Sequence, residues 1–197
     1  MAVIASGHSS GSDSGAGAGK GAAALLRTPF VRRVGAGAAL LPVSLAAVAA
    51  VAVGRPEAAR RWWGRLSAQG TANGHRPGAV RLLGHGLLAV PLGLLTLIPI
   101  GMELLFVLRG VFYPLVQPGP YTTAWGGPTT GGAWLAHFGV GLLTAAVGLG
   151  LLWLLDRLHA RLAGGMWGRR VGAWPVVATI LSLLGGALLV NAWTHQL

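Results

Sequence analysis

Two ionisable side chains lie inside long apolar stretches of this sequence, where a charged group is costly and rarely present without a role. Glu103 stands near the end of one stretch, and His137 stands near the start of the next. A carboxyl group and an imidazole ring that meet can share a proton or bind a ligand together. Glu103 and His137 are therefore the first candidates for chemistry.

Helical periodicity predicts that these two side chains face each other. In alternating steps of four and three residues, Glu103 shares one helical stripe with small and polar side chains, and His137 shares another. If the helices are antiparallel and pack through these stripes, Glu103 meets His137 and Thr96 meets Thr144. Small residues along both stripes would let the backbones approach closely. The predicted packing residues are Ala89, Gly93, Thr96, Gly141, Thr144, Ala145 and Gly148.

The Glu103–His137 pair has two interpretations. As a functional site, it responds to protons or to a ligand at the mouth of a helix hairpin, beneath the loop that joins the helices. As a structural feature, it is a hydrogen bond that fixes the register of the helices. The residues predicted to sense a ligand or signal are Glu103, His137, Trp125, Gly126, Gly127, Pro128 and Trp134.

The remaining ionisable groups predict no catalysis. His85, Asp156 and His159 fall near the cytoplasmic ends of the stretches and are expected to be solvated, with Asp156 close to Arg157 or Arg81. The sequence has no paired carboxylates, no His-Glu-x-x-His helix and no Gly-x-Ser-x-Gly turn. Its histidines are too scattered for a metal site, and the lack of cysteine excludes thiolate ligands. We predict no enzyme activity, no metal and no cofactor.

The segment from Tyr113 to His137 connects the two stretches. Its prolines and glycines cannot form a transmembrane helix, and an irregular backbone in contact with lipid is too costly. We expect a rigid turn at the membrane surface, anchored by Tyr121, Trp125 and Trp134.

Composition indicates that lipid is the solvent for most of the chain. The 197 residues are 53% hydrophobic and 10% charged, whereas soluble domains carry about 25% charged residues. Uncharged runs of about 20 residues fit a hydrocarbon core of about 30 Å. We predict an all-α integral membrane bundle of about four transmembrane helices, the second of them kinked at Pro91 and Pro99. The predicted spans cover residues 34–54, 82–108, 134–155 and 174–193.

Residues 1–33 are rich in Gly, Ser and Ala and are expected to form a disordered tail before the transmembrane domain of residues 34–197. The first span, residues 34–54, is Ala-rich and contains Pro42. It is expected to be retained, and a cleavable signal peptide is the alternative.

The net charge of +11 reflects membrane topology rather than nucleic-acid binding, because the arginines lie between the apolar stretches. With four spans, the arginines of the first and third connections face the cytoplasm, and the loop of residues 109–133 is extracytoplasmic. The Lys and Arg residues of the tail then lie on the extracytoplasmic side, against the rule that positive charge is kept on the cytoplasmic side. In the first connection, arginines beside Trp62 and Trp63 indicate a short amphipathic helix on the membrane surface. A positive loop with aromatic anchors is the alternative.

Several of these segments resemble the sensor domain of bacterial membrane sensor histidine kinases. The resemblance covers roughly residues 37–164. It rests on the LPVSL run that begins at Leu41, the arginine-rich segment Glu57–Leu66, Pro91-Leu92-Gly93, the YTTAWGGP loop of Tyr121–Pro128, and the GAWLAH segment of Gly132–His137. In that family, the domain usually precedes a cytoplasmic kinase or another output module.

The resemblance implies a free-standing sensor-like protein in a bacterial cell membrane, because a further span at residues 174–193 follows where a kinase would begin. It would detect an extracytoplasmic or membrane signal and relay it to a separate kinase or another signalling partner. Besides the lipid bilayer, a second copy of the chain is a possible partner, and nucleic acid is not. The alternatives are a small transporter or permease subunit, and a structural or assembly partner of another membrane protein.

Overall fold

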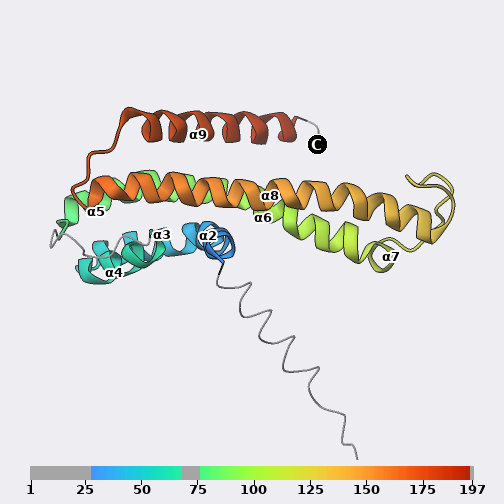
Figure 1. Ribbon diagram of the computed structural model, residues 1–197, viewed down its shortest axis with the longest axis horizontal. Coiled ribbons are helices and arrows are strands. Elements are labelled where there is room, and N and C mark those ends of the chain that lie inside the picture. Colours follow the sequence, from blue (N-terminus) through green and yellow to red (C-terminus); the bar gives the residue numbers. More distant parts are fainter. Residues whose placement is uncertain (1–27, 68–75, 196–197) are drawn as a thin grey trace, which may run out of the picture. The chain divides into compact units, whose positions relative to one another are not determined.

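The computed structural model describes residues 28–67 and 76–195, and within these ranges the protein is all-α, with no strand. This confirms the predicted fold class. The elements are α2 (Pro29–Ala38), α3 (Leu40–Ala52), α4 (Pro56–Leu66), α5 (Ala79–Leu95), α6 (Leu97–Leu105), the π-helical η1 (Phe106–Val111), α7 (Tyr113–Val116), α8 (Thr130–Met166) and α9 (Ala173–Thr194) (Figure 1).

The chain divides into one unit that ends at Arg32 and a second from Arg33 to Leu197, and each is described by itself. The predicted disordered tail is wrong for residues 29–33, because α2 begins at Pro29 and includes all five of them. Proline favours the first turn of a helix, where its missing N–H is not needed. Residues 1–27 of the predicted tail lie outside the described residues.

Among the described residues, three helices are long and apolar enough to cross a membrane: Ala79–Val111, Thr130–Met166 and Ala173–Ala192. They correspond to the predicted spans 82–108, 134–155 and 174–193. The second of them is longer than predicted, because α8 continues to Met166 through most of the expected third connection. No proline interrupts this extension, and its arginines are compatible with a helix.

The span of Ala79–Val111 is interrupted near its middle, as Pro99 predicts, whereas α5 continues through Pro91. Helix α5 ends at Leu95 and α6 begins at Leu97. Pro99 has no N–H to offer the Leu95 carbonyl, so one helical hydrogen bond is lost there. The buried Thr96 hydroxyl donates instead to the Gly93 carbonyl at 2.6 Å.

The predicted first span, residues 34–54, is not one straight helix. Helices α2 and α3 form a bent pair with an angle of 56°, so the described residues hold three spans, or four if this pair crosses. The bend lies where backbones touch. The Gly37 backbone packs against the Leu152 carbonyl, and a side chain built on Gly93 would come within 2.7 Å of the Leu41 Cα atom.

The bent pair stays beside one end of α8. Arg33 forms an ion pair with Asp156 at 3.0 Å, and Val51 belongs to the same buried cluster as Met166. Gly37, which lies between Arg33 and Val51 in the sequence, contacts α8 at Leu152. These contacts cover residues 152–166 of α8, about 21 Å of its length, and leave about 33 Å from Leu152 back to Thr130.

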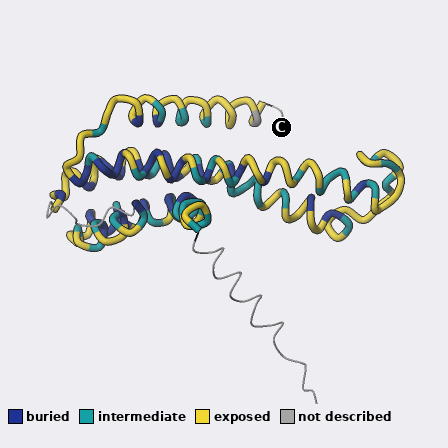
Figure 2. The backbone as a smooth tube through the Cα atoms, in the orientation of Figure 1, coloured by how far each residue is buried: buried dark blue, intermediate teal, exposed yellow. Residues whose placement is uncertain are grey.

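The predicted short amphipathic helix is present as α4. Trp63 is fully buried with α3 and α5, whereas Trp62 is 37% exposed. Arg60 forms an ion pair with Glu57 at 2.5 Å, and its hydrogen bond lowers the pKa of the Glu57 carboxyl. The main core thus lies among α3, α4, α5 and the adjacent part of α8. Figure 2 shows these buried residues, with α9 exposed along most of its length.

Candidate functional site

The loop before α8 is held by its own backbone. Gly126 has φ +92°, a conformation that favours glycine, and the Gly132 carbonyl occupies the space where its Cβ atom would be. Gly132 meets the Gly126 carbonyl in the same way. Thr129 caps α8 by accepting a hydrogen bond from the Gly132 N–H at 3.1 Å. The glycines of the WGGPTTGG sequence therefore attach the loop directly to the first turn of α8.

Gly126→Ala is expected to release this loop. The methyl group would collide with the Gly132 carbonyl, and the positive φ angle adds about 1 kcal/mol of strain. Hydrogen exchange of residues 113–130 should become faster, with the melting temperature of the bundle nearly unchanged. Gly131→Ala is the matched control, because no atom lies within 4 Å of its added carbon. Equal exchange in the two variants would contradict the proposed attachment.

Beneath the loop lies a cavity of about 360 Å³. Two of its lining residues form an aromatic stack, in which the centroids of the Tyr113 and His137 rings are 4.0 Å apart and the rings are inclined by 19°. The His137 Nδ1 atom lies 2.8 Å from the Ala133 carbonyl oxygen, which only accepts, so Nδ1 donates there. The polar and aromatic residues that line the cavity are Arg109, Tyr113, Gln117, Tyr121, Thr123, Trp125 and His137.

The structure places the predicted sensing residues in different roles. His137 and Trp125 line the cavity. Trp134 instead donates through Nε1 to the Val111 carbonyl at 3.1 Å, which ties α8 to η1. Gly126 and Gly127 have positive φ angles in the turn that ends before Pro128.

Sequence reasoning did not predict that an arginine lines this cavity. Arg109 was not among the predicted sensing residues, yet it lines the same cavity as His137 and Trp125. It belongs to η1, a π-helical turn, and such turns are frequent at functional sites. The signal in the sequence was its position, since Arg109 is the one cation between the second and third apolar stretches.

The predicted Glu103–His137 pair is wrong. A side chain on Gly148 would come within 2.5 Å of the Glu103 Oε1 atom, so Glu103 lies against Gly148. His137 is eleven residues earlier on α8, about 16 Å away along the axis. Large side chains fill the spaces left by glycines: Phe106 lies against Gly141, as Glu103 does against Gly148. These contacts fix the register.

The predicted Thr96–Thr144 contact is also absent. The Thr144 hydroxyl donates within its own helix to Gly141, and the residue is exposed, whereas Thr96 is buried and bonded to Gly93. Among the other predicted packing residues, Gly93 contacts α3 rather than α8. Ala89 and Ala145 are both buried.

Glu103 has no hydrogen-bond partner for its buried Oε1 atom. Its neighbour Gly148 is near the middle of α8, so this carboxyl group lies far from both ends of that helix. A carboxyl group in such a position is a candidate for proton binding.

The prediction that His85 and His159 are solvated is wrong. Both are buried, and their Nε2 atoms lie 3.2 Å apart, so one ring donates and the other accepts. The edge of Trp63 packs on His85 with ring centroids 4.9 Å apart. His159 Nδ1 is buried without a partner.

Asp156 is buried too, and its partner is Arg33 rather than the predicted Arg157 or Arg81. Because α8 remains helical here, Asp156 and His159 share its inward face. Arg157 and Arg161 are turned outward and exposed.

No metal site is evident in the part of the chain that the structure describes, where no three His, Asp or Glu side chains cluster. Comparisons of the chain with models of protein families, with curated proteins and with solved structures found no match.

Proposed function

We propose that this protein is a multi-pass membrane sensor without catalysis of its own, which binds a small anionic ligand beneath the loop and relays the event to a partner protein. The observation that carries this proposal is the cavity that joins Arg109 to His137 and Trp125. An arginine fork and a tyrosine hydroxyl suit a carboxylate or phosphate group, and His137 adds a donor at Nε2 when its ring is protonated. The aromatic rings would cover the rest of a small ligand.

The charges of the chain support an extracytoplasmic position for this cavity. If the bent pair α2–α3 is re-entrant, it enters and leaves on one side, and three helices cross. Every Lys and Arg residue except Arg109 then lies on the cytoplasmic side. Four spans would put the cations of the tail and those of the first connection on opposite sides of the membrane. Three spans remove this conflict. The contacts of the bent pair with residues 152–166 of α8 support this topology.

The re-entrant topology predicts which cysteines an impermeant thiol reagent labels on intact cells. Thr123→Cys should be labelled, whereas Val53→Cys and Gly172→Cys, both exposed, should not. Ser10→Cys should also stay unlabelled, because the tail shares the side of Val53. Labelling at Ser10 with Val53 protected would mean that α2–α3 crosses the membrane.

A route for the signal follows the packing of η1 and α6 on α8. Arg109 lies on η1, one turn after Phe106, whose ring contacts Gly141. A ligand that draws Arg109 into the cavity would shift this π-helical turn and its contact with α8. The next contact along α8 joins Glu103 to Gly148, and the His85–His159 pair lies beyond it. A kinase or another signalling protein would read the change at that far end.

The experiment that tests the binding step is calorimetric titration of the protein in nanodiscs with phosphate, sulfate, citrate, succinate and glutamate. We expect at least one of these anions to bind the wild type, and Arg109→Gln to weaken binding about tenfold or more, as loss of a charge-assisted contact does. Arg55→Gln, on an exposed residue outside the cavity, is the charge-matched control. An anion that binds both variants equally well would contradict the proposal.

A proton-coupled transporter is the second candidate, and one observation favours it. Glu103 holds an unpartnered carboxyl oxygen against the middle of α8, as proton-carrying groups in transporters do. Proton flux across vesicles that is abolished by Glu103→Gln would support this alternative. A sensor would give no flux in either form.

A further inference from the structure

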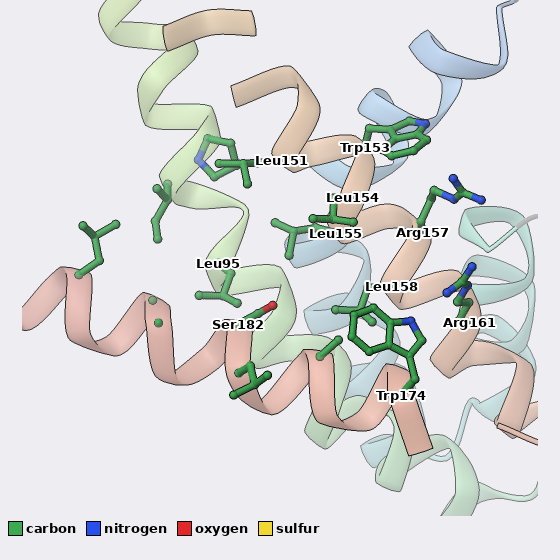
Figure 3. Close-up of a pocket in the computed structure, with 17 residues that line it drawn as sticks. Leu95, Leu151, Trp153, Leu154, Leu155, Arg157, Leu158, Arg161, Trp174 and Ser182 are labelled. Carbon is green, nitrogen blue, oxygen red and sulfur yellow. The ribbon is translucent and has the colours of Figure 1, made fainter. Parts of the chain in front are cut away.

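A long apolar groove runs between α9 and the helices α6 and α8. Its volume is about 530 Å³, and its walls are mostly apolar side chains, with Leu95 and Leu151 across from Ser182 of α9 (Figure 3). Helix α9 contributes little burial of its own, because Leu181, Leu184 and most of its other apolar side chains are exposed. The groove is thus open to whatever surrounds the helices, which in a membrane is lipid.

One end of the groove is basic. Arg157 and Arg161 line it one turn apart on α8, beside Trp174 (Figure 3). The Arg157 guanidinium lies over the Trp153 ring, 4.7 Å from its centre. Tryptophan and arginine together are typical of the level where hydrocarbon meets the headgroups.

A second cavity of about 270 Å³ continues from this end and shares Arg161. It adds Arg169 and Arg170 from the connection between α8 and α9. The two ion pairs found among the described residues do not involve these arginines: Asp156 pairs with Arg33, and Glu57 pairs with Arg60. No carboxylate of this part of the chain therefore neutralises the basic end.

The depth of the groove matches one leaflet of a bilayer. From Arg161 to Leu151, α8 advances about 15 Å, which is half of a hydrocarbon core of about 30 Å. An occupant that fits must be anionic at one end and apolar over one leaflet. A second copy of this chain would bring the same arginines to the same end, where like charges repel.

We propose that this groove binds an anionic phospholipid, with one acyl chain between α8 and α9 and its phosphate group on Arg157 and Arg161. Arg169 and Arg170 extend the basic surface around the headgroup. Basic pockets between transmembrane helices are known to hold anionic headgroups. The site is separate from the loop cavity of the proposed sensor and does not depend on it.

Native mass spectrometry of the purified full chain tests this site, with dioleoyl phosphatidylglycerol compared with dioleoyl phosphatidylcholine. We expect tighter binding of phosphatidylglycerol in the wild type. The double variant Arg157→Gln/Arg161→Gln should weaken it about thirtyfold, as loss of two arginine contacts near a membrane surface does. Arg55→Gln/Arg65→Gln removes the same charge outside the groove and should bind as the wild type does.

The acyl chain is tested separately with Gly185→Trp. Gly185 lines the groove, and no atom lies within 4 Å of a carbon added there, so a larger side chain can begin at this position without a backbone clash. This variant should lose phosphatidylglycerol although all its arginines remain. Equal affinity for the two lipids, equal loss in the control double variant, displacement by inorganic phosphate, or unchanged binding in Gly185→Trp would each overturn the proposal.

Discussion

Trp63→Ala is expected to lower the free energy of unfolding by about 3–5 kcal/mol, the usual cost of deleting a buried tryptophan. Trp63 is fully buried, its ring edge packs on His85, and its Nε1 atom donates to the Ser44 hydroxyl at 3.4 Å. Its removal leaves a cavity among α3, α4 and α5. Equilibrium unfolding in mixed detergent micelles, followed by circular dichroism, measures the loss.

The neighbouring tryptophan provides the control. Trp62 is 37% exposed, so Trp62→Ala should change the free energy of unfolding by no more than about 0.5 kcal/mol. If the two variants lose the same stability, α4 is not packed through Trp63. The amphipathic helix would then bind only the membrane surface, as its sequence alone allows.

Gly93→Leu is expected to separate α3 from α5 and to cost about 3 kcal/mol, at the upper end of the usual penalty for overpacking. The added carbon would lie 2.7 Å from the Leu41 Cα atom and 3.0 Å from its nitrogen. A backbone cannot turn aside as a side chain can, so the whole helix must move.

Gly84→Leu is the matched change on the same helix, with no atom within 4 Å of the added carbon. It should preserve stability or raise it, because leucine favours a helix more than glycine does. The same unfolding measurement applies to both variants. Similar losses at the two positions would show that the Gly93–Leu41 contact is not what holds α3.

Hydrophobic patterning was sufficient to predict most of the fold. Uncharged runs locate α8 and α9. Pro99 predicts the interruption between α5 and α6. The bend between α2 and α3 could not be predicted from hydrophobic patterning. It depends on a contact between the Gly37 backbone and Leu152, far apart in the sequence.

The candidate site was predicted only in part, because register cannot be read from periodicity alone. His137 and Trp125 were identified, and both line the loop cavity. Glu103 was placed with them because its helical stripe of small and polar residues matches the stripe of His137. The helix in fact continues through η1 to Val111, so Tyr113 rather than Glu103 reaches His137.

The buried histidines show a second limit of pattern reading. His85 and His159 lie near the cytoplasmic ends of the predicted apolar stretches, which suggested contact with solvent. Helical geometry instead turns Asp156 and His159 toward the protein, and Arg157 and Arg161 away from it. Only the length of α8, which extends to Met166, reveals which face is buried.

Relay through the helices is the central claim, and hydrogen exchange tests it most directly. The wild-type protein in nanodiscs is measured with and without the anion that binds most tightly in the titrations. The account predicts altered exchange in residues 106–116, next to Arg109, and also at the far end, in residues 79–92 and 152–166. A change confined to residues 106–138, with the far end unaffected, would show that the cavity binds a ligand but relays nothing.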